Sequence, residues 1–182
     1  MKTLGIIISL VLLTATWAYC QHEPDVHEVN QFQHHRLALF TGYNLIPNAI
    51  NEEGEKRVKI IPVLGLDYEY WFNHKFALGL HNDLELDSYT VEKDHQEYLE
   101  RHLAFATALV FMYEPMLGWV LFAGPGYEFE KNHSFGLFKI GTEVGKSFQG
   151  GWSAGITVAY DIKEVNSSFI FGLTIGKRLG KH

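Results

Sequence analysis

The chain has 182 residues, a length that is typical of a single domain. Its formal net charge of -6 provides no basic surface of the kind that nucleic-acid-binding proteins carry, so no nucleic-acid partner is expected. Aromatic residues make up 14% of the sequence and glycine occurs 17 times, a composition that favours strands and tight turns over helices.

The first 20 residues have the composition of a secretory signal peptide (1–20). Lys2 precedes an apolar run over residues 4–13, which is too short to span a membrane as a helix. Cleavage can follow Ala18 or Cys20. We favour Cys20, which leaves Gln21 as the mature N-terminus. A lipidated Cys20 is the alternative, but Trp17 and Tyr19 interrupt the run of small residues that precedes the cysteine of a lipoprotein signal. With cleavage after Cys20, the mature chain has no cysteine and begins with a polar lead over residues 21–33.

From residue 34 onward, apolar and polar residues alternate with the period of a strand. The eight alternating segments are 34–46, 58–72, 76–89, 101–113, 118–130, 135–148, 151–161 and 168–179. Long polar connectors alternate with short ones, as they do in outer-membrane barrels, where the short turns lie on the periplasmic side. An even number of strands predicts that both termini lie on that side as well.

The two faces of these segments differ in volume. The outward face predicted for 101–113 is bulky, whereas the other face consists mainly of alanine and other small residues. The interior of an eight-stranded barrel is just wide enough for side chains to fill it. We therefore predict that the small face points inward and that the bulky face, with Leu109 at its centre, meets lipid.

Aromatic residues cluster near both ends of the segments. Trp119 and Phe129 are ten residues apart. At about 3.3 Å per residue and about 40° tilt, this spacing corresponds to about 25 Å, the height of the apolar band of an outer-membrane barrel. The sequence thus predicts two aromatic girdles, formed by Tyr43, Tyr70, Phe72, Tyr113, Trp119, Tyr127, Phe129, Phe148, Trp152, Tyr160 and Phe169.

Segments such as 63–70 and 171–176 resemble the strands of small eight-stranded outer-membrane barrels, the OmpA/OmpX-like and related outer-membrane-protein β-barrel families. The resemblance covers residues 34–182 as a pattern. It implies an all-β, eight-stranded antiparallel up-and-down transmembrane β-barrel in the outer membrane of a Gram-negative bacterium, behind a cleaved signal peptide. It also implies contact with outer-membrane lipid, lipopolysaccharide and the barrel-assembly machinery. The sequence departs from these families at one point. Their last strand usually ends on an aromatic residue, whereas here residues 177–182 read Lys-Arg-Leu-Gly-Lys-His.

The inward faces carry charged residues, which we expect to pair in the lumen because unpaired buried charges are costly. A tight turn between the sixth and seventh segments places Lys139 opposite Asp161, and a three-residue turn after the second places Asp67 opposite His81. Asp87 is expected to face inward too. The predicted lumen network consists of Arg36, Lys59, Asp67, Glu69, His81, Asp83, Glu85, Glu128, Lys139, Glu143, Asp161 and Arg178.

A metal site is the alternative interpretation of His81, Asp83 and Glu85, since residues i, i+2 and i+4 share one face of a strand. We favour the structural network and expect no metal and no cofactor. The only adjacent His–Ser pair, His133 and Ser134, has no fixed acid partner, so no catalytic residue is predicted.

The sequence therefore predicts a non-enzymatic outer-membrane barrel with a structural or surface-interaction role and a plugged polar lumen. Three alternatives stay open: an exported soluble β-barrel that binds a small apolar ligand, a lipid-modifying outer-membrane enzyme, and a narrow transport pore. The polar connectors 47–57 and 90–100 are candidate sites for an unknown surface partner.

Overall fold

The computed structural model describes residues 32–180 except 52–53, 93–97, 131–133 and 164. The predicted signal peptide (1–20) and most of the polar lead (21–33) lie outside the described residues. In the part of the chain that is described, no helix is long and apolar enough to cross a membrane.

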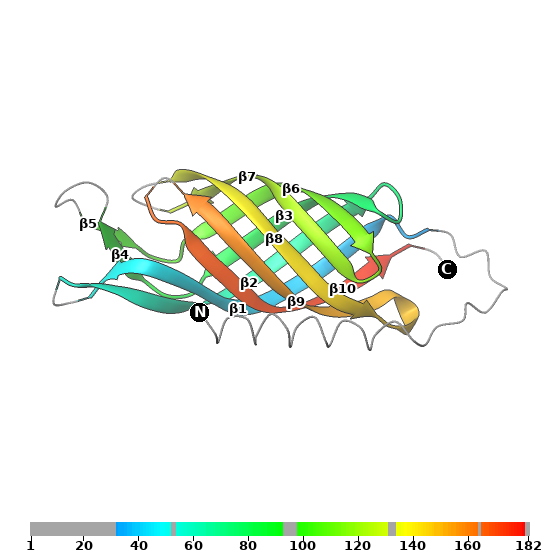
Figure 1. Ribbon diagram of the computed structural model, residues 1–182, viewed down its shortest axis with the longest axis horizontal. Coiled ribbons are helices and arrows are strands. Elements are labelled where there is room, and N and C mark those ends of the chain that lie inside the picture. Colours follow the sequence, from blue (N-terminus) through cyan, green and yellow to red (C-terminus); the bar gives the residue numbers. More distant parts are fainter. Residues whose placement is uncertain (1–31, 52–53, 93–97, 131–133, 164, 181–182) are drawn as a thin grey trace, which may run out of the picture. The chain divides into compact units, whose positions relative to one another are not determined.

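Eight strands form a closed antiparallel barrel (Figure 1). Each strand pairs with the next along the ring, and β1 pairs with β10 from His35↔Leu179 to Leu45↔Phe169, which closes the sheet. The eight-stranded up-and-down architecture predicted from the sequence is confirmed. The barrel strands are β1 (His35–Ile50), β2 (Lys56–Trp71), β3 (Phe76–Glu85), β6 (Phe105–Met116), β7 (Trp119–Phe129), β8 (Phe135–Ser147), β9 (Trp152–Lys163) and β10 (Ser168–Leu179).

The two ends of the barrel differ. At one end, called the proximal end here, β1 begins and β10 ends, and short turns join β2 to β3 and β8 to β9, the latter through a 3-10 turn, η1 (Gln149–Gly151). At the opposite, distal end, β4 (Tyr89–Glu92) and β5 (Tyr98–Arg101) form an additional hairpin, seen at the left of Figure 1. This hairpin joins the sheet through the last residues of β1, with Ala49 opposite Val91.

The distal hairpin corrects the predicted segments 76–89 and 101–113. The first strand ends at Glu85 and the second begins only at Phe105. Just before the second strand, Leu103 has a positive φ of 49°, which shifts the alternation of inward and outward side chains. Arg101 and Ala104 are consequently both buried, although an odd step of three positions would place them on opposite faces of a regular strand. Residues 90–100, predicted as a connector, supply most of the hairpin, and most of 47–57 extends β1 and β2.

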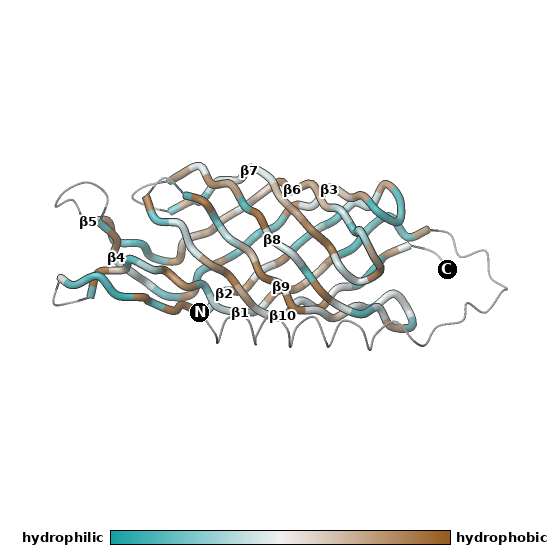
Figure 2. Tube along the Cα trace, viewed as in Figure 1, coloured by the Kyte–Doolittle hydropathy of each residue, from teal (hydrophilic) through white to brown (hydrophobic). Residues whose placement is uncertain are grey.

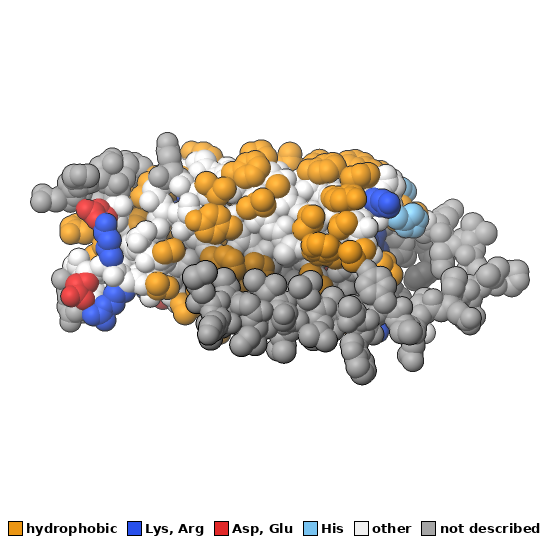
Figure 3. Space-filling model, viewed as in Figure 1, with side chains coloured by type: hydrophobic (Ala, Val, Ile, Leu, Met, Phe, Trp, Pro, Cys, Tyr) orange, Lys and Arg blue, Asp and Glu red, His pale blue; other side chains and the backbone are white. Residues whose placement is uncertain are grey.

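Side chains alternate between the lumen and the outer wall. In β2 the alternation is unbroken from Ile60 to Trp71. Large hydrophobic side chains lie exposed on all eight barrel strands, with exposed fractions of 59% for Leu39, 49% for Leu109 and 60% for Ile156. Figure 3 shows these side chains over the visible face of the wall, and Figure 2 shows hydrophilic residues gathered at the distal end. The predicted orientation, with the bulky face outward, is confirmed.

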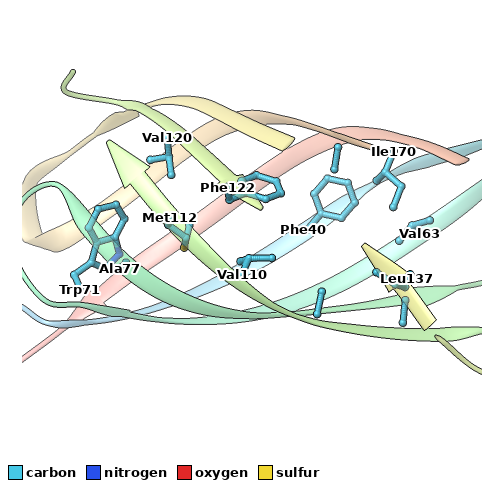
Figure 4. Packing of buried hydrophobic residues seen from close by; sticks show 13 residues of the cluster. Phe40, Val63, Trp71, Ala77, Val110, Met112, Val120, Phe122, Leu137 and Ile170 are labelled. Atoms are coloured by element: carbon cyan, nitrogen blue, oxygen red, sulfur yellow. The ribbon is translucent and has the colours of Figure 1, made fainter. Parts of the chain in front are cut away.

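The lumen is filled by side chains that include three large aromatic rings, Phe40, Trp71 and Phe122 (Figure 4). Glycines in the wall make room for them. A Cβ atom at Gly42 or at its cross-strand neighbour Gly172 would lie 2.8 Å from the Phe40 ring. Large and small side chains therefore interdigitate on the inner face of the barrel, whereas the sequence pattern indicated an inner face made mainly of small residues.

Candidate functional site: the ion-paired lumen

The predicted lumen charges fall into three clusters along the barrel axis. In the proximal cluster, Arg36 lies between two carboxylates. Its Nη1 is 2.5 Å from Glu69 Oε1 and its Nη2 is 2.7 Å from Glu143 Oε1. Trp71 Nε1 donates to the second oxygen of Glu69 at 2.7 Å, and Arg36 Nε donates to Ser153 Oγ at 3.2 Å. These contacts tie β1, β2, β8 and β9 together across the interior.

The middle cluster is centred on Lys139. Its ammonium group is 2.7 Å from Asp161 Oδ1 and 3.1 Å from Asp83 Oδ2. The register places Lys139 directly opposite Asp161, which confirms that predicted pairing. Asp67 accepts a hydrogen bond of 3.1 Å from the backbone N–H of Asn82. Its carboxylate is thus hydrogen-bonded to the backbone of β3.

His81 lies in the same middle region and is 7% exposed. Its ring packs edge-on against Phe122, with the centroids 4.9 Å apart, and Nε2 has no hydrogen-bond partner among the described residues. Its neighbours on the strand are engaged elsewhere, Asp83 by Lys139 and Glu85 by Asn44 Nδ2 at 2.7 Å. Among the described residues, no group of three or more His, Cys, Asp and Glu side chains is placed to hold a metal ion.

The distal cluster is built around two cations that the sequence reasoning missed, Arg101 and Lys163. Lys163 pairs with Glu128 and lies 3.5 Å from Glu85. Arg101 also pairs with Glu128 and lies 3.5 Å from Glu130. All five side chains are at most 4% exposed, so the charges compensate one another away from water.

Arg101 belongs to β5, so the distal cluster joins the hairpin to the barrel. Tyr89 is its cross-strand partner at the base of the hairpin, and the Arg101 guanidinium lies 4.7 Å from the centroid of the Phe135 ring. An apolar cluster packs around this base. Its members are Ile46, Ala49, Ile61, Tyr89, Val91, Leu99 and Phe135. The base of the hairpin therefore occupies the distal mouth of the barrel.

Three residues expected in the lumen lie toward its ends. Lys59 and Asp87 form a 3.2 Å pair at the distal end, with side-chain exposures of 38% and 51%. Arg178 is half-buried at the proximal end, over the Trp71 ring at 4.8 Å. The Ser88 backbone N–H, and then the Lys59 ammonium, hold the pKa of the Asp87 carboxyl below its usual range. Asp87 is therefore a surface group, which corrects its predicted inward position.

One signal for Lys163 was present in the sequence. It continues the inward series Thr157, Ala159 and Asp161 by one step beyond the predicted strand end. The inward position of Arg101 could not be predicted in this way. The positive φ of Leu103 places Arg101 out of phase with the inward residues of the strand that follows.

No catalytic constellation is found at the predicted His–Ser pair. His133 lies outside the described residues, and the Ser134 hydroxyl donates to the Glu130 carbonyl at 3.5 Å. A different pair, Ser88 Oγ and His102 Nδ1, lies 2.5 Å apart at the distal end. The neighbouring Asp87 uses its two oxygens for the Ser88 backbone N–H and for Lys59. Among these contacts, Asp87 therefore does not bind His102 as the acid of a Ser–His–Asp hydrolase would.

All residues predicted for the two girdles lie exposed on the outside of the barrel. Those at the proximal end are Tyr70, Phe72, Tyr113, Trp119, Phe148 and Trp152, and those toward the distal end are Tyr43, Tyr127, Phe129, Tyr160 and Phe169. Stacked neighbours strengthen the proximal set, for example Phe76 and Tyr113, whose ring centroids are 5.2 Å apart.

No protein-family model matches the sequence, and no curated protein matches it. Solved structures do match. The N-terminal β-barrel domain of Pseudomonas aeruginosa OprF aligns with a TM-score of 0.53 and 14% identity, over 81% of this chain and 98% of that one. The chain has the fold of the small outer-membrane β-barrels.

Two further outer-membrane barrels have the same fold. The outer membrane protein OprG from Pseudomonas aeruginosa aligns with a TM-score of 0.52 and 13% identity, over 84% of this chain and all (100%) of that one. Neisserial surface protein A aligns with a TM-score of 0.50 and 7% identity, over 80% and 97% of the two chains. At these identities the likeness concerns the fold, and the resemblance to outer-membrane barrels inferred from the sequence is confirmed at that level.

Proposed function

We propose that this protein spans the outer membrane of a Gram-negative bacterium and serves there as a structural or surface-interaction barrel rather than as an enzyme. The observation that carries the proposal is the outer wall, where large hydrophobic side chains are exposed on all eight strands. A surface of this extent requires an apolar environment. The proximal end, where β1 begins and β10 ends, would face the periplasm, because the short turns lie at that end.

The same observation argues against a soluble barrel that binds an apolar ligand. Such a barrel needs an apolar interior and a polar exterior. Here Glu69, Lys139 and Asp161 are buried in the interior, each in an ion pair, while Leu109 and Phe111 lie exposed outside.

Site-directed spin labelling tests which face meets lipid. In a Cys20→Ser background, a label on Leu109→Cys should be relaxed by oxygen, which partitions into lipid, and shielded from a water-soluble nickel reagent. A label on Glu55→Cys, in the exposed distal turn, should show the reverse. Ala108→Cys, which is 1% exposed, should label poorly because added volume overpacks the lumen. A water-accessible Ala108 with Leu109 shielded from both reagents would overturn the membrane assignment.

We further propose that the lumen is closed to solutes. The support comes from the three ion-paired clusters, from the aromatic rings of Phe40 and Phe122, and from the hairpin base at the distal mouth. Planar-bilayer recordings should therefore show no large, stable conductance, since eight strands leave no aqueous channel. Steady porin-sized openings, absent from protein-free detergent controls, would contradict this proposal and favour the transport pore.

The partners proposed for such a barrel are outer-membrane lipid and lipopolysaccharide around the wall and the barrel-assembly machinery during insertion. A surface partner would meet the distal end, where the turn between β1 and β2 and the β4–β5 hairpin project. Among the described residues, that end carries Glu55, Glu92 and Glu100 at its surface, together with Lys56 and Arg57.

A further inference from the structure

The outer wall at the proximal end carries a lysine among lipid-facing aromatic residues. Trp152, Lys177, Leu37 and Tyr68 occupy one row across β9, β10, β1 and β2, in the order of their cross-strand pairs. Trp152, Leu37 and Tyr68 are 50%, 41% and 41% exposed. Lys177 has the same outward phase as Phe171, Leu173 and Ile175 in β10, so its charge is on the outer wall and not in the lumen.

His35 lies in the next row toward the proximal end, paired with Tyr70 and Leu179. Its Nδ1 is 2.7 Å from the Tyr68 hydroxyl. Diagonal neighbours on adjacent antiparallel strands have Cα atoms about 7–8 Å apart, within reach of long side chains, and His35 and Lys177 are related in this way. When the Tyr68 hydroxyl donates to Nδ1, the imidazole N–H at Nε2 is left to donate to a further acceptor.

The Lys177 ammonium is oriented by its neighbours but not neutralised by them. It lies 4.9 Å from the Trp152 ring centroid and donates to the Gly150 carbonyl. An ammonium group has three N–H donors, so this arrangement leaves others available for an anion. The cation is thus held at the edge of the apolar band, next to an aromatic ring of the proximal girdle.

The exposed charges around this row are positive. Among the described residues, Glu114 is the only carboxylate at the proximal end whose side chain is not in a lumen cluster, and it lines a small cavity with Arg36 and Arg178 instead of facing outward. Exposed Lys75 and Lys146 add positive charge at the same end. The acidic surface residues lie at the opposite, distal end.

We propose that the patch formed by Lys177, His35, Tyr68 and Trp152 binds the phosphate of an anionic phospholipid in the leaflet at the proximal end. Lys177 supplies the charge, His35 supplies an N–H donor that Tyr68 orients, and Trp152 packs against the glycerol and upper acyl region. An amphipathic tryptophan is well suited to that depth. The inference rests on the proposed membrane location and goes further, since it names the lipid class, the leaflet and the residues.

The test uses the purified barrel in nanodiscs that contain equal amounts of phosphatidylglycerol and phosphatidylcholine. The ratio of the two lipids retained by the protein is read by native mass spectrometry. A cation near an anionic membrane surface accounts for about a fivefold preference, so Lys177→Gln should lower the retained ratio about fivefold. His35→Gln should lower it as well, without removing a fixed charge. Lys177→Arg should keep the wild-type ratio, as should Lys56→Gln, which removes a distal surface lysine.

Two outcomes separate this inference from the proposed function. If the protein fails to float with phosphatidylcholine vesicles, the membrane location itself is wrong and the lipid site falls with it. If it floats, and Lys177→Gln and His35→Gln retain the two lipids as the wild type does, the barrel stays a membrane protein and the phosphate site is overturned. Equal losses in Lys177→Gln and Lys56→Gln would likewise overturn it, because the effect would then reflect net charge.

Discussion

Replacing Lys139 by methionine should cost the barrel about 3–5 kcal/mol of stability, the usual effect of removing one partner from a buried ion pair. The ammonium group is 2.7 Å from Asp161 and 3.1 Å from Asp83, and its side chain is 3% exposed. Without it, two carboxylates remain in the lumen with no cation between them. Urea unfolding in lipid vesicles, followed by the gel shift of unboiled samples, measures the loss.

The charge argument is separated from a volume effect by a compensated variant. A triple substitution, Lys139→Met with Asp83→Asn and Asp161→Asn, removes the cation together with the carboxylates it neutralises, and should recover much of the stability. Lys56→Met is the matched surface control. Its pair with Glu92 has side-chain exposures of 58% and 29%, so its loss should stay below about 1 kcal/mol. If Lys139→Met unfolds at the same urea concentration as Lys56→Met, the middle cluster does not stabilise the barrel.

Arg101→Met should release the distal hairpin while leaving the barrel strands paired. The guanidinium is 1% exposed and joins β5 to Glu128 and Glu130 at the ends of the barrel wall. Breaking such a buried contact costs about 3–5 kcal/mol. Only β4 and β5 depend on it directly, because their remaining ladder to the barrel is the short pairing with β1 at Ala49 and Ile50.

Amide hydrogen exchange resolves this effect strand by strand. Protection of residues 89–92 and 98–101 should fall in Arg101→Met, whereas that of β7, β8 and β9 should be retained. Arg57→Met, which removes an exposed partner of Glu55 at the other distal turn, is the control and should leave both regions unchanged. Unaltered protection of the hairpin in Arg101→Met would show that apolar packing around Tyr89 holds it without the ion pairs.

Some of the charge pairs in the lumen follow from the spacing of residues along the sequence, and others do not. Strict alternation brings Lys139 opposite Asp161 once the turn between β8 and β9 is tight, so that pair could be derived from spacing. Arg36 likewise lies directly opposite Glu69 on the neighbouring strand β2, but its second partner, Glu143, is on β8 across the lumen. Which inward charge meets which across a barrel depends on the stagger of all the strands, and local spacing does not contain that information.

The sequence by itself determined the closed eight-stranded fold and the bulky outer face. These follow from the period of two, from turn composition and from the volume that an eight-stranded lumen admits. Only the tertiary structure decided the distal end. There, the positive φ of Leu103 shifts Arg101 inward, and a predicted connector becomes a hairpin whose base meets Lys163 and Glu128. The physical reason is that alternation is a local property of a strand, whereas the pairing of buried charges is set by contacts between strands far apart in sequence.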